Sequence, residues 1–161
     1  MTVAEYNQCV EMYADGVYRF ILKNIKNEDN ARDIVQDAFA KMWEKVKDIS
    51  HQKGKSYLFT AAYHTMIDVI RKEKHLENYQ KNHLQDLIEE QSYSDLKEIL
   101  NHAVARLPEI QRSVLLLRDY EGYSYKEIGE ITDLNESQVK VYIYRARVLM
   151  KNYLVSIDRV I

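Results

Sequence analysis

The stretch 124–150 decides the fold, and it reads SYKEIGEITDLNESQVKVYIYRARVLM. Ser124 and Glu127 have the spacing of a capping box, so a helix is expected to begin directly after Ser124. Asp133 interrupts the apolar pattern with a short polar side chain that tolerates a left-handed turn. Asn135 then supplies the cap of a second helix. The stretch therefore predicts two helices joined by a tight turn.

The second helix of this pair has two contrasting faces. Its inner face repeats apolar side chains at spacings of three and four, at Val139, Ile143, Ala146 and Met150. Its outer face presents Ser137, Gln138, Lys140, Val141, Tyr144, Arg145 and Arg147. From Lys140 to Lys151 there are basic residues and no acid, which suits the phosphates of a duplex. Any two amphipathic helices with a short connection share this layout, but the charge distribution favours a DNA-reading helix-turn-helix.

The composition bounds the class of protein. Of 161 residues, 46% are hydrophobic and 30% are charged, so the chain can bury a core. One proline and four glycines supply few helix breakers, and an all-α fold is expected. No apolar run approaches the roughly 20 residues of a membrane span, and the beginning MTVAEYNQC lacks a basic leader and apolar core. A single cysteine, Cys9, fits a reducing compartment, so we expect a cytoplasmic protein without membrane insertion.

The charge of the chain is segregated although its net value is only −2. Residues 51–75 are basic, residues 76–99 are acidic, and basic residues gather again on the second helix of the motif. Two basic stripes separated by an acidic segment suggest two nucleic-acid contacts made by two modules. We therefore predict two small helical domains, at 1–75 and 96–161, joined by a linker at 76–95.

The helix expected over Ala31–Lys47 has a polar face opposite its apolar one. Asp33, Gln36 and Asp37 lie three and four residues apart, and therefore side by side. Carboxylates near a helix N-terminus are favoured by the helix dipole, and such a cluster is usually a solvated face. The alternative is a patch that docks on arginines of a partner protein.

A further helix is expected over Ser56–Lys74, and three of its aromatic side chains fall off its apolar stripe. These are Tyr57, Tyr63 and His64. Aromatic rings in such positions can stack on unpaired bases, or they can simply pack against a neighbouring helix. The basic residues that end the helix are favoured by its dipole and suit DNA equally well.

Other chemistry finds little support in the sequence. The histidines are scattered and form no pair at ligand spacing with each other or with Cys9. There is no glycine-rich phosphate loop and no serine within a glycine elbow. We therefore expect no metal site, no cofactor and no catalytic residue, and the chain is predicted not to be an enzyme.

Three segments together resemble bacterial sigma-70 factors. NARDIVQDAFAKMWEKV (30–46) and KSYLFTAAYHTMIDVIRKEK (55–74) are similar to the second domain of that family. LPEIQRSVLLLRDYEGYSYKEIGEITDLNESQVKVYIYRARVLMKNYL (107–154) is similar to the fourth domain. With only a short connection between them, the chain resembles the smallest group of the family, the extracytoplasmic-function (ECF) sigma factors.

The resemblance implies a factor that directs core RNA polymerase to promoters and initiates transcription. Its partners would be promoter DNA, the clamp helices of the largest polymerase subunit, the flap of the second subunit, and an anti-sigma factor. Clamp contacts would come from Asp33, Gln36 and Asp37. Contacts to the −10 element would come from Tyr57, Thr60, Tyr63, His64, Asp68, Arg71 and Lys72. Contacts to the −35 element would come from Ser137, Gln138, Lys140, Val141, Tyr144, Arg145 and Arg147.

The sequence departs from the family pattern at three places. Tyr57 stands where tryptophan is usual, and Tyr63 and His64 stand where arginine and asparagine are common, so the −10 preference does not carry over directly. Asp133 replaces the usual turn glycine.

Two other functions compete with the sigma-factor interpretation. A stand-alone dimeric helix-turn-helix regulator would not need the acidic face around Asp33, and a protein–protein adaptor would show no salt-dependent DNA binding.

Overall fold

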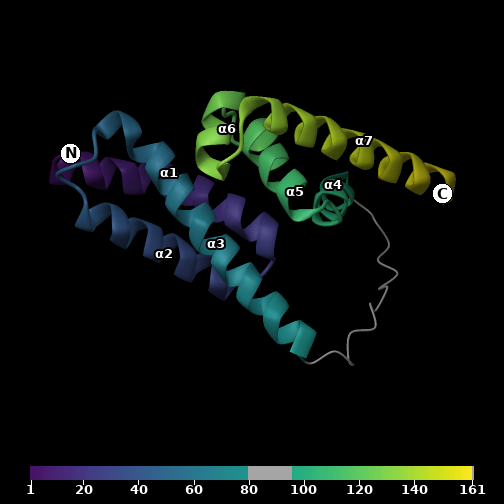
Figure 1. The fold of residues 1–161 in the computed structure, drawn as a ribbon, viewed down its shortest axis with the longest axis horizontal. Coiled ribbons are helices and arrows are strands. Elements are labelled where there is room, and N and C mark those ends of the chain that lie inside the picture. Colours follow the sequence, from purple (N-terminus) through teal and green to yellow (C-terminus); the bar gives the residue numbers. More distant parts are fainter. Residues whose placement is uncertain (80–95, 161) are drawn as a thin grey trace.

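Residues 1–79 and 96–160 are described by the computed structural model, and every regular element among them is helical, as predicted. The N-terminal half contains α1 (Val3–Ile25), α2 (Glu28–Glu44), the short 3-10 helix η1 (His51–Lys53) and α3 (Gly54–Tyr79). Figure 1 shows these helices packed side by side. Of the predicted linker at 76–95, residues 76–79 continue α3, and residues 80–95 lie outside the described part.

Local capping defines where the first two helices begin. Thr2 accepts a hydrogen bond from the Glu5 backbone N–H, and Glu5 accepts one from the Thr2 N–H, which completes a capping box. Asn27 accepts from the Asn30 N–H at 3.0 Å and begins α2. Both caps follow the sequence pattern, because each satisfies a backbone donor that the first helical turn leaves unpaired.

The connection between α2 and α3 differs from the prediction. The polar sequence DISHQKGK over Asp48–Lys55 predicts a loop with a chain reversal at Gly54. In the structure, Gly54 is instead the first residue of α3 and has a right-handed φ of −58°. The glycine is explained by packing, since a Cβ there would lie 2.7 Å from Cys9 Sγ. Close contact with α1 therefore fixes where α3 begins.

The C-terminal half consists of α4 (Leu96–Ala105), α5 (Glu109–Leu115), a π-helical turn η2 (Leu116–Tyr120), α6 (Tyr125–Thr132) and α7 (Glu136–Val160). Pro108 lies directly before the first helical residue of α5, where its missing N–H removes no helical hydrogen bond. α7 continues to Val160, beyond the predicted end at Met150. Its added turns lie beside α4, where the Arg106 guanidinium sits 4.6 Å from the Tyr153 ring centroid.

The start of α6 and the turn between α6 and α7 have the predicted form. Ser124 and Glu127 make a reciprocal capping box, and Asp133 adopts the left-handed conformation with φ 59°. Gly129 is required by a close approach: a Cβ there would meet the Leu134 carbonyl oxygen at 2.5 Å. The inner face of α7 is buried at Val139, Ile143 and Ala146, as expected.

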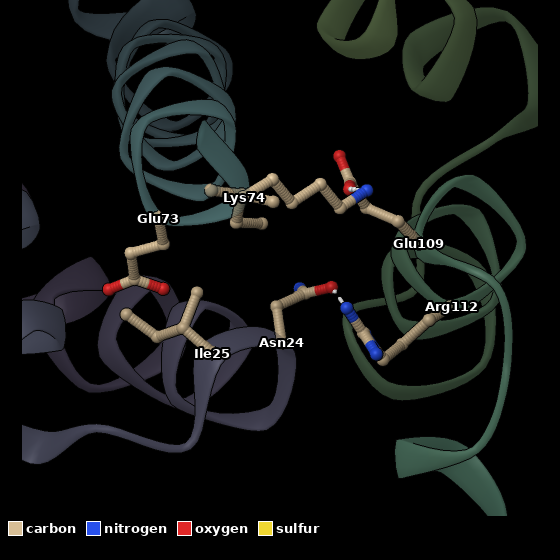
Figure 2. A pocket seen from close by; sticks show the side chains of 7 residues that line it. Asn24, Ile25, Glu73, Lys74, Glu109 and Arg112 are labelled. Atoms are coloured by element: carbon tan, nitrogen blue, oxygen red, sulfur yellow. Dashed lines mark hydrogen bonds and ion pairs between the residues drawn. The ribbon is translucent and has the colours of Figure 1, made fainter. Parts of the chain in front are cut away.

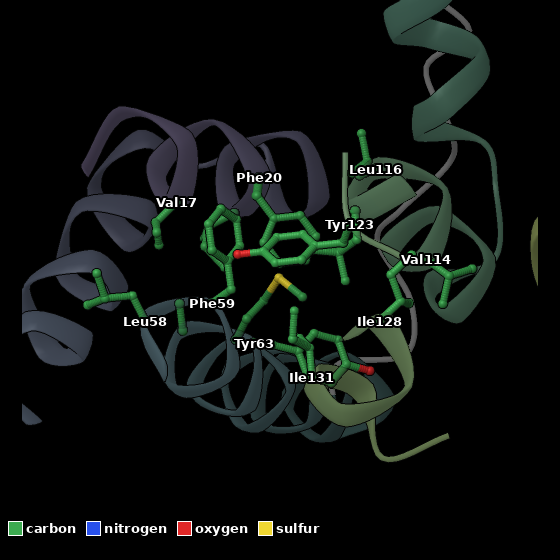
Figure 3. Close-up of a cluster of buried hydrophobic side chains, with 14 of the residues drawn as sticks. Val17, Phe20, Leu58, Phe59, Tyr63, Val114, Leu116, Tyr123, Ile128 and Ile131 are labelled. Carbon is green, nitrogen blue, oxygen red and sulfur yellow. The ribbon is translucent and has the colours of Figure 1, made fainter. Parts of the chain in front are cut away.

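The two halves share one hydrophobic core. Figure 3 shows Phe59 and Tyr63 of α3 facing Tyr123, Ile128 and Ile131 of the C-terminal half. The rings of Phe59 and Tyr123 meet edge to face with centroids 5.3 Å apart. α3 packs against α6, and α1 packs against α4 and α5. The sequence predicted two modules without their relative placement, and the structure joins them directly.

Within 1–79 and 96–160, no helix is both long enough and apolar enough to cross a bilayer. The same residues contain no group of histidine, cysteine, aspartate and glutamate side chains arranged to hold a metal ion.

Candidate nucleic-acid interface

The outer face of α7 is open to solvent along its first turns. Every residue predicted to contact the −35 element is exposed: Ser137, Gln138, Lys140, Val141, Tyr144, Arg145 and Arg147. Two of them expose large apolar surface, with Val141 at 45% and Tyr144 at 70%. A face that mixes amide, hydroxyl, cationic and apolar groups can offer hydrogen bonds and methyl contacts to base edges in a major groove.

The basic residues of this face differ in their partners. Arg147 donates to both carboxylate oxygens of Asp119, at 2.7 and 3.4 Å, and this hydrogen bonding raises the Arg147 pKa. Lys140 lies 3.6 Å from the Glu136 carboxylate one helical turn earlier. For Arg145 the described part of the chain provides no such carboxylate. Of the two arginines on this face, Arg145 is therefore the one whose guanidinium could bind an anionic partner without breaking an internal ion pair.

A second basic cluster beside α7 was not predicted. The Tyr125 ring, at the first position of α6, has the Arg118 guanidinium 4.4 Å and the Lys140 ammonium 5.4 Å from its centroid. Arg118 also donates to the Tyr123 carbonyl oxygen at 2.9 Å, which holds its side chain in place. No periodicity in the sequence marks Arg118, because its proximity to α7 arises only when η2 folds against the helix pair.

The residues predicted to contact the −10 element lie along α3 but do not form one open surface. His64, Asp68, Arg71 and Lys72 are exposed. Tyr57 and Thr60 are half-buried and line a cavity of about 490 Å³, together with Asp48, Ile49, Ser50, Lys53, Ser56 and Glu130. Glu130 belongs to α6. The cavity is thus formed jointly by the two halves of the molecule.

Tyr63 differs from the rest of this set because its side chain is buried, with only 6% exposed. Burial raises the pKa of its phenol to about 12, and the nearby Glu109 and Asp133 carboxylates act in the same direction. Both carboxylates come from the C-terminal half. In this arrangement the Tyr63 ring belongs to the shared core, as Figure 3 shows, and it is not available to stack on a base.

On the acidic face of α2, some side chains are exposed to solvent and one is held by neighbouring residues. Asp33 and Gln36 are exposed. Asp37 is held by Lys41 Nζ at 3.0 Å and accepts a hydrogen bond from Thr65 Oγ1 of α3 at 3.1 Å. The Lys41 hydrogen bond is the main reason that the Asp37 pKa is lowered, and Thr65 adds to it. Asp33 and Gln36 are therefore open to solvent, whereas Asp37 ties α2 to α3.

A second cavity, of about 470 Å³, lies between the halves and is drawn in Figure 2. On one side, the Asn24 side-chain oxygen accepts from Arg112 Nε and from Ser113 Oγ, each at 3.1 Å. On the other side, Lys74 Nζ lies 3.3 Å from a Glu109 carboxylate oxygen. Burial lowers the Arg112 pKa. These polar pairs join α1 and α3 to α5 across the interface.

Family models match two parts of the chain. The model of Sigma-70 region 2 matches residues 9–76, and the model of Sigma-70, region 4 matches residues 97–150. The ECF RNA polymerase sigma factor SigM of Bacillus subtilis is 30% identical over 156 residues, which cover 94% of each chain. The RNA polymerase sigma factor SigV of the same organism is 31% identical over 153 residues, covering 93% of this chain and 91% of SigV.

Solved structures share the fold. The sigma factor RpoE of Bartonella quintana, in complex with the anti-sigma factor NepR, matches with a TM-score of 0.78 and 22% identity. The match covers 94% of this chain and 98% of that one. CnrH, in complex with the cytosolic domain of CnrY, matches with a TM-score of 0.69 and 20% identity. At these identities the likeness concerns the fold.

Proposed function

The chain belongs to the sigma-70 family, as an RNA polymerase sigma factor of the ECF group, and from this premise we propose how its surfaces divide the work of initiation. A sigma factor directs core polymerase to promoters. Residues 1–75 would bind core polymerase and the −10 element, residues 96–161 would bind the −35 element, and residues 76–95 would connect them. The protein would act in the cytoplasm, where polymerase meets DNA.

The observation that carries the proposal is the pair of exposed faces on α2 and α7. Asp33 and Gln36 of α2 would dock on arginines of the clamp helices, since carboxylates favour bidentate arginine partners. Arg145 and its neighbours on α7 would read the −35 element, while the Arg118 and Tyr125 cluster would contact phosphates nearby. We also propose that the flap of the second polymerase subunit binds the C-terminal half, and that an anti-sigma factor regulates the chain.

Promoter opening would use binding energy and no catalytic group. The unstacked bases of the −10 element would be captured along α3 by Tyr57, Thr60, Tyr63, His64, Asp68, Arg71 and Lys72. Unstacking costs a few kcal/mol, and contacts to the flipped bases would offset it. A stand-alone dimeric regulator is not favoured, because this chain aligns over almost its whole length with RNA polymerase sigma factors.

The test is run-off transcription over a genomic library with purified core polymerase. Adding the protein is expected to create new start sites, and Asp33→Arg is expected to remove them, because the variant sets a cation against the clamp arginines. Glu11→Arg is the matched control, since it makes the same charge change at an exposed acid of α1 outside the predicted surfaces. Absence of new start sites with the wild-type protein, together with absence of clamp-helix binding, would overturn the proposal.

A further inference from the structure

We propose that Gln138 reads the −35 element as a hydrogen-bond donor only, and that it therefore selects guanine over adenine at the base pair it contacts. The inference deepens the proposed function and rests on it, because it takes the outer face of α7 to lie in the major groove.

Two reciprocal hydrogen bonds at the start of α7 fix the side chain of Gln138. The Gln138 backbone N–H donates to Asn135 Oδ1 at 2.8 Å, and the Asn135 backbone N–H donates to Gln138 Oε1 at 3.0 Å. A backbone N–H can only donate, so the end of the Gln138 amide that faces Asn135 is its carbonyl oxygen. The carbonyl and amino ends of this side chain are therefore not interchangeable.

The amino group of Gln138 is the end left for DNA. Gln138 is exposed and is the third residue of α7, within the face predicted to contact the −35 element. Its Nε2 has no hydrogen-bond partner in residues 1–79 and 96–160. The neighbouring acid, Glu136, is occupied by Lys140 at 3.6 Å. Gln138 thus presents N–H donors to a ligand and holds its acceptor against the helix.

A glutamine that is free to turn uses both ends of its amide on adenine. Its oxygen accepts from the N6 amino group while its amino group donates to N7. Gln138 could make this pair only by turning Oε1 away from Asn135, which would leave the Asn135 N–H without a partner. Such an unpaired donor is costly once DNA has displaced water from the interface. The hydrogen bond to Asn135 therefore works against adenine.

Guanine is the better match for a side chain that only donates. Its major-groove edge carries two neighbouring acceptors, N7 and O6, whereas adenine places a donor amino group beside its acceptor N7. The Gln138 amino group can hydrogen-bond along the guanine edge without moving Oε1, but on adenine it would face another donor. Cytosine presents only a donor in the major groove and is disfavoured for the same reason.

Binding of the polymerase holoenzyme to a set of duplexes tests the inference. Each −35 base pair is changed in turn to all four possibilities, and fluorescence anisotropy measures the affinity of holoenzyme containing the wild type, Gln138→Ala or Gln138→Glu. The base pair that Gln138 contacts is the one whose preference changes in Gln138→Ala. At that base pair the wild type is expected to favour guanine over adenine by about fivefold or more, and Gln138→Ala is expected to remove most of this preference.

Gln138→Glu separates the cap from the donor. Its carboxylate can still accept from the Asn135 N–H, since glutamate is common at this position of a capping box, but it has no amino group. We expect its preference to reverse toward bases with an amino group, adenine or cytosine. Ratios between duplexes are compared, because the added negative charge weakens binding to all of them. Gln8→Glu, the same change at an exposed residue of α1, is the matched control and should keep the wild-type preference.

Two results of the duplex experiment overturn the inference. One is a preference for adenine in the wild type at the base pair identified by Gln138→Ala. The other is a Gln138→Ala variant with unchanged base preferences, although the wild-type protein gives new start sites. Failure of the proposed function gives a different pattern, in which the wild-type protein itself gives no new start sites.

A second measurement uses hydrogen exchange of the free protein. The Asn135 amide hydrogen is expected to exchange at least about tenfold faster in Gln138→Ala than in the wild type and in Gln138→Glu, because only the alanine variant lacks the acceptor. Equal exchange in all three proteins would show that Oε1 does not hold this N–H, and would also overturn the inference.

Discussion

At the scale of single residues, identical side chains on α7 differ in what they can do. Arg145 and Arg147 are both exposed and only two positions apart. Arg147 is held by Asp119 with an atom separation of 2.7 Å, whereas Arg145 faces solvent. A side chain already paired must exchange one partner for another when DNA binds, so its net contribution to affinity is smaller.

We therefore expect Arg145→Ala to weaken binding of the polymerase holoenzyme to a promoter with an intact −35 element by about 1–3 kcal/mol, the cost of losing a base-edge contact. Fluorescence anisotropy with labelled duplexes, taken from the run-off start sites, measures the effect. The loss should vanish on duplexes whose −35 element is scrambled.

Arg147→Ala is the matched comparison. It should weaken holoenzyme binding to intact and scrambled duplexes alike. It should also reduce the number of counterions released on binding by about one, as expected for a phosphate contact. An equal loss for Arg145→Ala on both duplexes would reassign Arg145 to the backbone.

At the scale of elements, the α6–α7 turn sets the angle at which the outer face of α7 is presented. Asp133 closes α6 in the left-handed region at φ 59°, where residues other than glycine are disfavoured. Gly129 allows the Leu134 carbonyl to approach the helix. Asp133 thus carries a side chain in a backbone conformation that glycine would adopt more easily, whereas Gly129 leaves no room for a side chain.

We expect Asp133→Gly to stabilise the chain by about 1 kcal/mol, because glycine adopts the left-handed conformation without a steric cost. Urea denaturation followed by circular dichroism measures the free energy of unfolding. Gly129→Ala should destabilise, since its Cβ would lie 2.5 Å from a backbone oxygen that cannot shift independently. Equal stability of Gly129→Ala and the wild type would mean that the turn can open at little cost.

At the scale of the whole molecule, the junction between the halves contains groups that titrate. Burial raises the pKa of Tyr63 from the ordinary value of 10.0 to about 12. Burial also raises the pKa of Tyr123, whose hydroxyl has no hydrogen-bond partner among the described residues. Neutral phenols are therefore part of what keeps the two halves together.

The sign of the pH dependence follows from proton binding. Below pH 10 both folded and unfolded states keep the Tyr63 proton, so Tyr63 has no effect on stability there. Between pH 10 and about 12 the unfolded state loses the proton first, and the free energy of unfolding falls as pH rises. Two pKa units correspond to at most about 3 kcal/mol.

Urea denaturation at a series of alkaline pH values checks this expectation. Tyr63→Phe should flatten the alkaline fall in stability, and the control Tyr144→Phe, at a 70% exposed side chain, should leave it unchanged. The same steep fall in wild type and Tyr63→Phe would mean that Tyr63 is exposed in solution, and thus that the halves are not packed as described.

Local signals in the sequence determined much of the fold. The capping box at Ser124 and the left-handed turn at Asp133 depend on neighbours within a few residues, so their prediction is confirmed. The helical class and the family resemblance are also confirmed. The predicted end of α7 at Met150 was wrong, since no helix breaker follows Met150 and the helix continues to Val160. The predicted chain reversal at Gly54 was also wrong, because the glycine is explained by contact with the Cys9 side chain, which lies far away along the chain.

The sequence by itself determined the helical class and the family, and it predicted three surfaces: Asp33 and its neighbours, the aromatic and basic side chains of α3, and the outer face of α7. Their roles stay predictions. Only the tertiary structure decided which of these surfaces are open. Tyr63 is covered because α6 packs on α3, Arg145 is exposed on the outer face of α7, and Arg147 is engaged because η2 brings Asp119 beside α7. The pattern of a single segment shows which face is apolar, but it does not show which distant segment packs on that face.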